Sequence, residues 1–297
     1  MSRIHQLTVS ELREHPESVA SILSIGFLED VGGAFRRLAE PDDVEALHDF
    51  RVAVRRLRST LRAYKLFLPS NASAIRLRLK EMASATGPAR DAEVQLEWLD
   101  RLGSVAGELP HDVVISVRRE LEHARTHGYA VARERIDREF ASIAADLRSS
   151  LRTTGARSTE PSILVLGGIV RRHSHSFQSK LACVNSLDDE RPLHRLRIQT
   201  KRLRYLLEPL SAELDFVRPM IGELRVLQDL LGDVRDLGML GGRFRELEPT
   251  RVPDPIERRR HRTWETFVES WRPGSGRVPY GIDQVADRVE FIIPDLL

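Results

Sequence analysis

Cysteine is nearly absent from this 297-residue chain, in which Cys183 is the only one. A single thiol excludes an intramolecular disulfide framework and a zinc site built on cysteines. Aromatic residues make up only 6% of the sequence, which is low for a β-sandwich or a β-barrel. No stretch approaches the ~20 consecutive apolar residues of a membrane span, and the N-terminal region lacks the basic start and apolar run of a signal peptide. We therefore expect a soluble, cytoplasmic protein.

Lysine is also scarce, because only Lys65, Lys80, Lys180 and Lys201 are lysines among the 46 basic residues, and the others are arginines. The 44 acidic residues leave a net charge of +2. Arginine presents a planar fork of donors that suits phosphate and carboxylate groups. A GC-rich genome would produce the same overall excess, so the positions of the cations are more informative than their number.

A basic motif recurs within the chain at an offset of 146 residues. Residues 47–58 read Leu-His-Asp-Phe-Arg-Val-Ala-Val-Arg-Arg-Leu-Arg, and residues 193–204 read Leu-His-Arg-Leu-Arg-Ile-Gln-Thr-Lys-Arg-Leu-Arg. A second pair follows at an offset of 145, with Gly-Pro-Ala-Arg-Asp at 87–91 and Gly-Asp-Val-Arg-Asp at 232–236. Two motifs in the same order at nearly the same offset predict a tandem duplication.

The predicted fold class is all-α, because apolar residues recur at helical spacing almost throughout and convincing strand alternation is absent. We expect two tandem four-helix-bundle-like halves, residues 1–157 and 158–297, related by a pseudo-twofold axis and joined at the turn formers of 153–161. Each glycine motif is expected to break a helix before its Arg-Asp pair. The tail 273–297 receives no assigned structure. The expected helices cover residues 47–65, 71–86, 91–103, 112–152, 162–183, 193–207, 215–231, 236–247 and 255–272.

The repeated helix presents a continuous stripe of cations beside its apolar face, at about 100° per residue. The first copy contributes His48, Arg51, Arg55, Arg58, Arg62 and Lys65, and the second contributes His194, Arg197, Lys201 and Arg204. Like charges at this spacing weaken an isolated helix by about 0.2–0.5 kcal/mol per pair. Because Asp49 is the only acid between residues 48 and 65, the stripe cannot be neutralised within its own helix.

Two sources could supply the missing negative charge. Facing helices could provide it through Asp91, Asp236, Glu93 and Glu97, or an anionic ligand could bind. Because two copies keep the histidine, the cations and the leucines at equal spacing, we favour a polyanionic ligand. Asp91 and Asp236 are then expected to orient Arg90 or Arg235, or to cap a helix, without acid–base work.

These motifs resemble those of the CHAD family, the conserved histidine α-helical domain. The pattern H-x-x-R-V-x-x-R-R-L-R with a Gly-x-x-Arg-Asp block, followed by H-x-L-R-I-x-x-K-R-L-R-Y and L-Q-D-x-L-G-x-x-R-D, covers about residues 5–275. The resemblance implies two helical bundles around a basic central groove or channel. It also implies binding of inorganic polyphosphate and association with polyphosphate granules. The Glu-x-Glu-x-Lys signature of the CYTH domain that precedes many family members is missing, so we expect a stand-alone version.

The resemblance also implies a set of phosphate ligands. The residues that match the motifs are His48, Arg51, Arg55, Arg58, Arg62, Lys80, Arg90, His194, Arg197, Lys201, Arg204, Arg225 and Arg235. We expect no catalytic residue, no cofactor and no metal, since His173 and His175 have the wrong spacing to face one ion on a helix. Aromatic side chains such as Trp98 and Trp271 are interpreted as core residues.

Other functions share part of this pattern and remain open. A helical nucleic-acid-binding protein would use the same electrostatics, but it would need aromatic stacking platforms or a helix-turn-helix. A phosphoryl-processing enzyme or its accessory protein would need carboxylates that hold Mg²⁺. A scaffold would close the stripes with internal acids. The oligomeric state is left undetermined.

Overall fold

The computed structural model describes residues 5–40, 45–103, 111–152, 157–247 and 254–272, together with residues 43, 155, 287 and 288. The part of the chain that the structure describes is helical and contains no β-strand, so the predicted all-α fold class is confirmed. The helices are α1 (Val9–Arg13), α2 (Pro16–Arg37), α3 (Ala46–Ala63), α4 (Ala72–Ala85), α5 (Gly87–Gly103), α6 (His111–Arg152), α7 (Ser162–Ala182), α8 (Glu190–Leu207), the 3₁₀ turn η1 (Glu208–Leu210), α9 (Val217–Leu247) and α10 (Asp254–Trp271).

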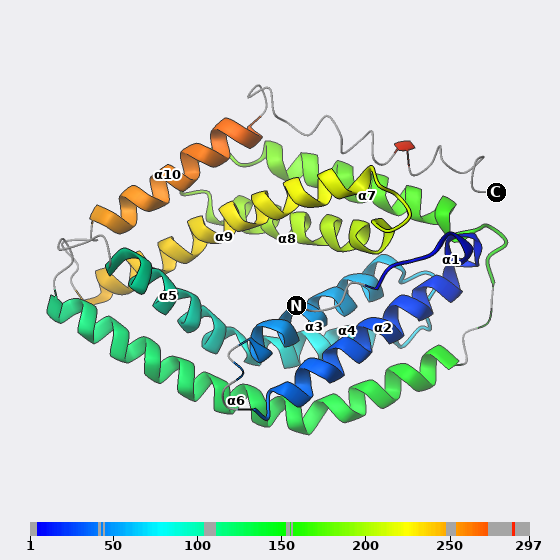
Figure 1. Cartoon of the computed structure of the whole chain (residues 1–297), viewed down its shortest axis with the longest axis horizontal. Helices are drawn as coiled ribbons and strands as arrows, with labels where there is room; N and C mark the ends of the chain where they lie inside the picture. The colour runs from blue at the N-terminus through cyan, green and yellow to red at the C-terminus, as the bar shows by residue number, and fades with distance from the viewer. Residues whose placement is uncertain are drawn as a thin grey trace.

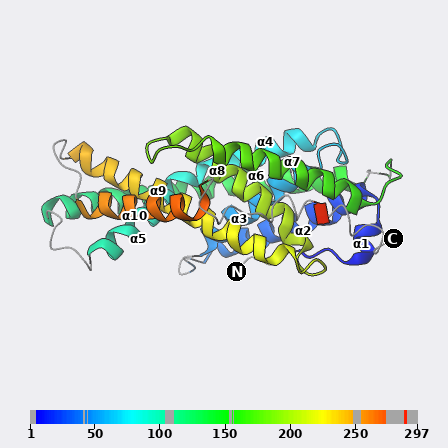
Figure 2. The ribbon, with the colours of Figure 1, turned by 90° about the horizontal axis from the view of Figure 1, so that it is seen from above.

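The helices form an elongated, closed arrangement. Figure 1 shows α6 along one long edge, α7 and α10 along the opposite edge, α5 toward one end and α1 at the other. Seen from above in Figure 2, α3 and α8 lie between α4 and α7 on one side and α1 and α2 on the other. The two helices that contain the repeated basic motif therefore occupy the interior of the arrangement.

Two hydrophobic cores hold these helices together. The larger core takes residues from α1 to α4, the C-terminal part of α6, α7, α8, the first half of α9 and the end of α10. The smaller core joins α5 and the start of α6 to the second half of α9 and the start of α10. Each core contains residues from both predicted halves, so both halves contribute to the same two cores. The motif residues of α5 and α9 lie where the two cores meet.

The apolar faces predicted for the repeated helix are confirmed. In α3, Leu47, Phe50 and Val54 are each at most 1% exposed, and the matching leucines of α8 are also buried. Helix α3 ends at Ala63, before Pro69, and α8 ends at Leu207, before Pro209. Trp98 and Trp271 are buried, which agrees with their interpretation as core residues.

The second glycine motif does not break a helix, so that expectation was wrong. Helix α9 runs without interruption from Val217 to Leu247 and includes Gly232. In the first copy, by contrast, α4 ends at Ala85 and α5 begins at Gly87. The difference follows from Pro88, which has no N–H to continue the preceding helix and favours the first turn of a new one. The second copy has Asp233 at that place and keeps its hydrogen-bond ladder.

Helix α2 combines 22 residues with a mean hydropathy of 1.3 over its most apolar 18-residue window. A membrane span and a core helix of a soluble protein share these properties. Half of that window is buried inside the structure, and α2 packs against α3. The tail 273–297 lies outside the described residues, apart from residues 287 and 288.

Candidate anion-binding site

The two basic helices, α3 and α8, pack against each other and bring cations of both motif copies into one cluster. Lys201 on α8 lies within electrostatic reach of Arg197 on the same helix and of Arg55 on α3. Arg55 in turn acts on Arg51 and His48. We call the following set the central cluster: His48, Arg51, Arg55, Arg90, His194, Arg197, Lys201 and Arg235.

The cations of the central cluster destabilise one another. Burial, together with the charges of Arg197 and Arg55, holds the pKa of Lys201 well below its usual value. Burial and the charge of Arg55 lower the pKa of Arg51 to about 10. A guanidinium is rarely displaced from its ordinary pKa. Burial and mutual repulsion therefore raise the free energy of the charged forms in the free protein, and a bound anion would lower it.

The two motif histidines share this environment. Burial and the charges of Arg90 and Arg55 lower the pKa of His48. Burial and the charges of Arg197 and Arg235 lower the pKa of His194. Both imidazoles are therefore neutral at pH 7 in the free protein, and each has one N–H to donate.

Acidic side chains neutralise only part of the central cluster. Arg235 on α9 forms ion pairs with Asp91 on α5, at 3.2 Å between Nη2 and Oδ2, and with Asp236 at 2.7 Å. These ion pairs raise the pKa of Arg235 against the effect of its burial. The Asp residues of both motif copies thus form ion pairs with Arg235, one of the two arginines with which they were expected to interact.

Arg90 takes different acidic partners, since its Nη1 lies 3.1 Å from Glu93 and 3.5 Å from Glu97. Two further acids lie on α9, Asp229 and Asp233, and neither was predicted as a site residue. Burial raises the pKa of both carboxyl groups, and for Asp233 the neighbouring aspartates bring it to about 6. Asp229, Asp233 and Asp236 share one helical face by their i, i+4, i+7 spacing, a signal that the sequence contained.

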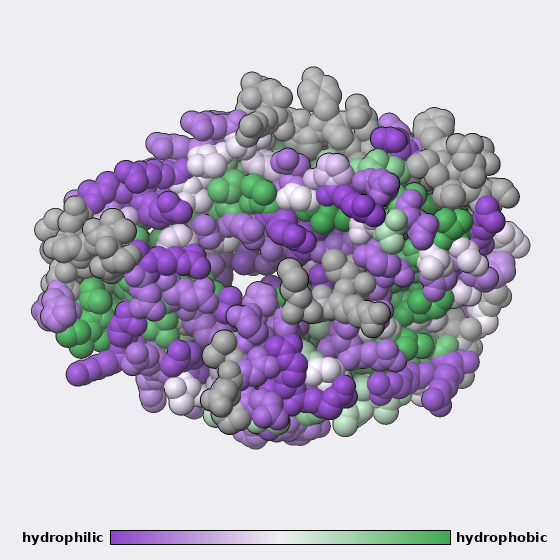
Figure 3. All heavy atoms as spheres, in the orientation of Figure 1, coloured by the Kyte–Doolittle hydropathy of each residue, from purple (hydrophilic) through white to green (hydrophobic). Residues whose placement is uncertain are grey.

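A cavity of about 600 Å³ opens beside the second-copy residues of the central cluster. Its lining includes His194, Arg197 and Arg235, with Asp188 and Glu190 as its acidic members. Four further arginines line it that the sequence analysis did not name: Arg191, Arg195, Arg245 and Arg260. The first two follow the i, i+4 spacing of α8, whereas no local pattern links the last two to the site. Figure 3 shows hydrophilic surface around an opening near the middle of the molecule.

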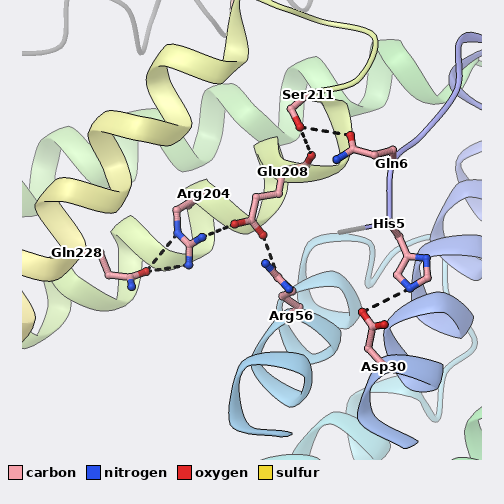
Figure 4. Close-up of polar contacts among 8 residues, drawn as sticks. All are labelled: His5, Gln6, Asp30, Arg56, Arg204, Glu208, Ser211 and Gln228. Atoms are coloured by element: carbon pink, nitrogen blue, oxygen red, sulfur yellow. Dashed lines mark hydrogen bonds and ion pairs between the residues drawn. The ribbon is translucent and has the colours of Figure 1, made fainter. Parts of the chain in front are cut away.

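Arg204, whose charge also acts on Lys201, belongs to a buried group that we call the Glu208 triad: Arg56, Arg204 and Glu208. Glu208 is 1% exposed, and its Oε2 lies 3.0 Å from Nε of Arg56. Its other carboxylate oxygen accepts a hydrogen bond from Arg204, and Arg204 also donates to Gln228 at 3.1 Å. Figure 4 shows the carboxylate between the two guanidinium groups. Internal groups thus already engage the guanidinium of Arg204.

The chain N-terminal to α1 closes the side of the molecule next to the Glu208 triad. The backbone N–H of Leu7 donates to the carbonyl of Pro209 at 2.8 Å, and Gln6 accepts from the backbone N–H of Ala212 at 2.9 Å. Figure 4 also shows His5 beside Asp30 of α2, at 3.5 Å between Nε2 and Oδ2. Tyr205 is buried, with the guanidinium of Arg204 4.7 Å from its ring centre.

The remaining predicted ligands do not join the central cluster. Arg58 and Arg62 interact electrostatically with basic residues of α4, α7 and α8. The charge of Arg55 also acts on Arg58. Lys80 and Arg225 are exposed, on α4 and α9. Among the described residues, no group of three or more His, Cys, Asp or Glu side chains is placed to hold a metal ion.

The fold and the cluster define the class of protein: an all-helical domain in which two interior basic helices pack together. The sequence profile of the CHAD domain matches residues 28–245, and the chain belongs to the CHAD domain family. Two solved structures share its fold. The CHAD domain from the plant Ricinus communis is 20% identical, with a TM-score of 0.70 and 95% of each chain covered. PptA from Streptomyces chartreusis is 16% identical, with a TM-score of 0.65 and coverage of 95% of this chain and all of that one.

A sequence comparison with curated proteins found no match. CHAD domains are associated with polyphosphate-related proteins. The family membership therefore places this chain among such domains, and the ligand of this particular chain has to be argued from its own residues.

Proposed function

We propose that this protein binds inorganic polyphosphate through the central cluster and does not process it. The observation that supports the proposal is the convergence of cations from α3 and α8 around Lys201, whose pKa is held well below its usual value. A bound polyanion would restore the charged forms that burial and mutual repulsion disfavour. Arginine forks can grip successive phosphates.

A linear ligand suits the layout better than a single phosphate does. The cations extend from the cavity at His194 and Arg197, across Lys201, to Arg55 and Arg51 on the other helix. A chain of phosphates could contact each of them in turn, whereas one phosphate could not. The resemblance to the CHAD family names the same class of ligand.

The site suits a phosphate chain better than a nucleic acid. The cavity beside the central cluster is lined by arginine, aliphatic and acidic side chains with His194 and Met239, and it has no Phe, Tyr or Trp among its described residues. Single-stranded nucleic acids are held largely by stacking of their bases on such rings. Inorganic polyphosphate has no bases, so it needs only the cations.

A direct test is titration of the purified protein with long-chain polyphosphate at two salt concentrations. We expect affinity to fall steeply with salt, because binding releases counterions from the polyanion. The double variant Arg55→Glu/Lys201→Glu should lose affinity by about 100-fold or more and keep its helical circular dichroism. A matched control is Arg119→Glu/Arg148→Glu, which reverses two exposed cations on α6 and should bind like the wild type.

Three results would overturn the proposal. Displacement of polyphosphate by duplex or single-stranded DNA would assign the cluster to nucleic acid. Release of orthophosphate during a long incubation would make the protein an enzyme. Unchanged affinity in Arg55→Gln/Lys201→Gln, the milder pair to use if the Glu variants fail to fold, would remove the ligand from the central cluster. If binding holds, we expect the protein in the cytoplasm, at polyphosphate granules.

A further inference from the structure

A second group of cations comes from α3, α4, α7 and α8, and Figure 2 shows α4 and α7 on one side of α3 and α8. Arg202 on α8 is surrounded by Arg58 and Arg62 on α3 and by Arg76 on α4. The charges of Arg62 and Arg202 also act on His173 of α7. We call these five residues the second cluster. Four helices from both halves of the chain contribute to it.

The second cluster has no internal counter-charge. Among the residues that the structure describes, no carboxylate pairs with Arg58, Arg62, Arg76 or Arg202. Burial and the neighbouring arginines lower the pKa of Arg202 to about 10 and that of His173 to about 4. Nε of Arg58 is buried without a hydrogen-bond partner. The free protein therefore concentrates positive charge here without neutralising it.

The Glu208 triad is the counterpart of this group in the other motif copy. At the offset of 146 residues, Arg56 corresponds to Arg202, and Arg204 corresponds to Arg58. The triad and the second cluster thus each combine one arginine from α3 with one from α8. The residue that α3 contributes to one group corresponds to the residue that α8 contributes to the other. Such an exchange is what a twofold relation between two copies produces, so it favours the predicted duplication.

The Glu208 triad and the second cluster differ in charge at one corresponding position. The residue that corresponds to Glu208 at the same offset is Arg62. In the triad a carboxylate at i+4 from Arg204 bridges both guanidinium groups. In the second cluster an arginine stands at i+4 from Arg58, so the bridging anion is missing and one more cation is present.

We propose that the second cluster is a separate anion site, in which a phosphate group takes the place that the Glu208 carboxylate occupies in the triad. A phosphate dianion matches the charge and the donor geometry of several guanidinium groups, which grip it with paired N–H donors. Its source is free orthophosphate or a phosphate group of a polyphosphate chain. The site does not depend on the proposed function of the central cluster.

His173 can donate a hydrogen bond to an anion in the second cluster. Its Nδ1 lies 3.1 Å from the amide nitrogen Nε2 of Gln199, and the same amide donates to the backbone carbonyl of His173 at 2.9 Å. Since an amide nitrogen only donates, Nδ1 must accept, and the ring proton resides on Nε2. A neutral His173 can therefore donate to an anion beside Arg62 and Arg202. Gln199 is buried and fixes this tautomer.

The experiment is thermal unfolding with and without phosphate at constant ionic strength, using Arg62→Glu. This variant supplies the carboxylate that the triad has. We expect Arg62→Glu to unfold at a higher temperature than the wild type in phosphate-free chloride buffer, because the introduced carboxylate pairs with Arg58 and Arg202. Orthophosphate should raise the wild-type Tm by about 3 °C and leave that of Arg62→Glu unchanged. Tripolyphosphate, which the central cluster is also expected to bind, is compared in the Arg55→Glu/Lys201→Glu background, where it should raise the Tm by about 3 °C only while Arg62 is present. Arg119→Glu on α6 is the charge-matched control and should respond like the wild type.

The ligand series identifies the source of the phosphate group. In the Arg55→Glu/Lys201→Glu background, a response to both ligands assigns free orthophosphate, and a response to tripolyphosphate alone assigns a phosphate group within a chain. The site is overturned if phosphate does not stabilise the wild type beyond chloride, or if Arg62→Glu and Arg202→Gln respond like the wild type. Arg55→Glu/Lys201→Glu must keep the orthophosphate response, or the tripolyphosphate response if that alone occurs. Its loss there would place the anion in the central cluster.

Discussion

The Glu208 triad and the second cluster show how one charge pattern can serve two purposes. In the triad a buried carboxylate satisfies two arginines from different helices. In the second cluster the corresponding arginines lie near further cations, and no carboxylate among the described residues pairs with them. The first arrangement fastens α3 to α8, whereas the second leaves an excess of charge that an external anion would balance.

This comparison teaches that a basic stripe in a sequence is not a uniform binding surface. Arg56 and Arg204 both belong to the repeated motif, yet both are less than 10% exposed and ion-paired. A buried arginine with a carboxylate partner stabilises the fold only if the pair stays complete. The cations without such a partner are the ones that remain available for a ligand.

The largest effect is expected from Glu208→Gln. This substitution removes the charge of the buried carboxylate and leaves the triad, like the second cluster, without a counter-charge. Two buried guanidinium groups would lose their carboxylate, which typically costs about 3–5 kcal/mol when one partner of a buried ion pair is removed. Urea denaturation would measure the free energy of unfolding. Glu213→Gln, at an exposed position of the following loop, is the control and should change it little. An unaltered stability of Glu208→Gln would show that the triad does not fasten the two helices.

A smaller effect is expected in the central cluster from Asp91→Asn. Asp91 holds the guanidinium of Arg235 at 3.2 Å, so it competes with a bound polyanion for the same donors. Removing its charge should raise polyphosphate affinity about threefold to fivefold, the range of a partly exposed ion pair. Asp100→Asn on the same helix, which pairs with Arg118 at 2.6 Å, should leave the affinity unchanged. A decrease with Asp91→Asn would mean that Asp91 positions Arg235 for the ligand.

Much of the fold could be predicted from the sequence, because helical periodicity is a local property. The apolar faces of α3 and α8 were predicted correctly. Residues 112–152 were expected to form one or two long helices, and they form the single helix α6. The helix break at Gly232 was predicted wrongly, since a glycine alone does not end a helix whose backbone hydrogen bonds can continue. Pro88 is the residue that ends the corresponding helix in the first copy.

The site was predictable only in part. The spacing of cations along α3 and α8 placed His48, Arg51 and Arg55 on one face correctly, but spacing cannot reveal which cation meets an acid from elsewhere in the chain. The environment of Arg204 depends on Gln228 of α9, to which it donates a hydrogen bond, and on the packing of α3 against α8. Neither can be inferred from the spacing of residues along α8. Arg202 was not predicted as a site residue, because the charge around it comes from two other helices, α3 and α4.

The smallest effect is expected from the histidines, which make polyphosphate affinity depend on pH. In the free protein, burial and neighbouring arginines lower the pKa of His48 and His194 below the usual 6.5, whereas a bound phosphate raises it. Binding is then coupled to proton uptake between the free and the bound pKa. Affinity should therefore rise, by a few-fold, as the pH is lowered from 8 to 5.5. Long chains keep the titration of terminal phosphates negligible. His48→Gln/His194→Gln should reduce the slope of the profile, and the pH dependence that remains belongs to Lys201, whose pKa is also lowered in the free protein. A wild-type affinity that is constant over this range would show that neither imidazole touches the ligand, and would leave the arginines as its only anchors.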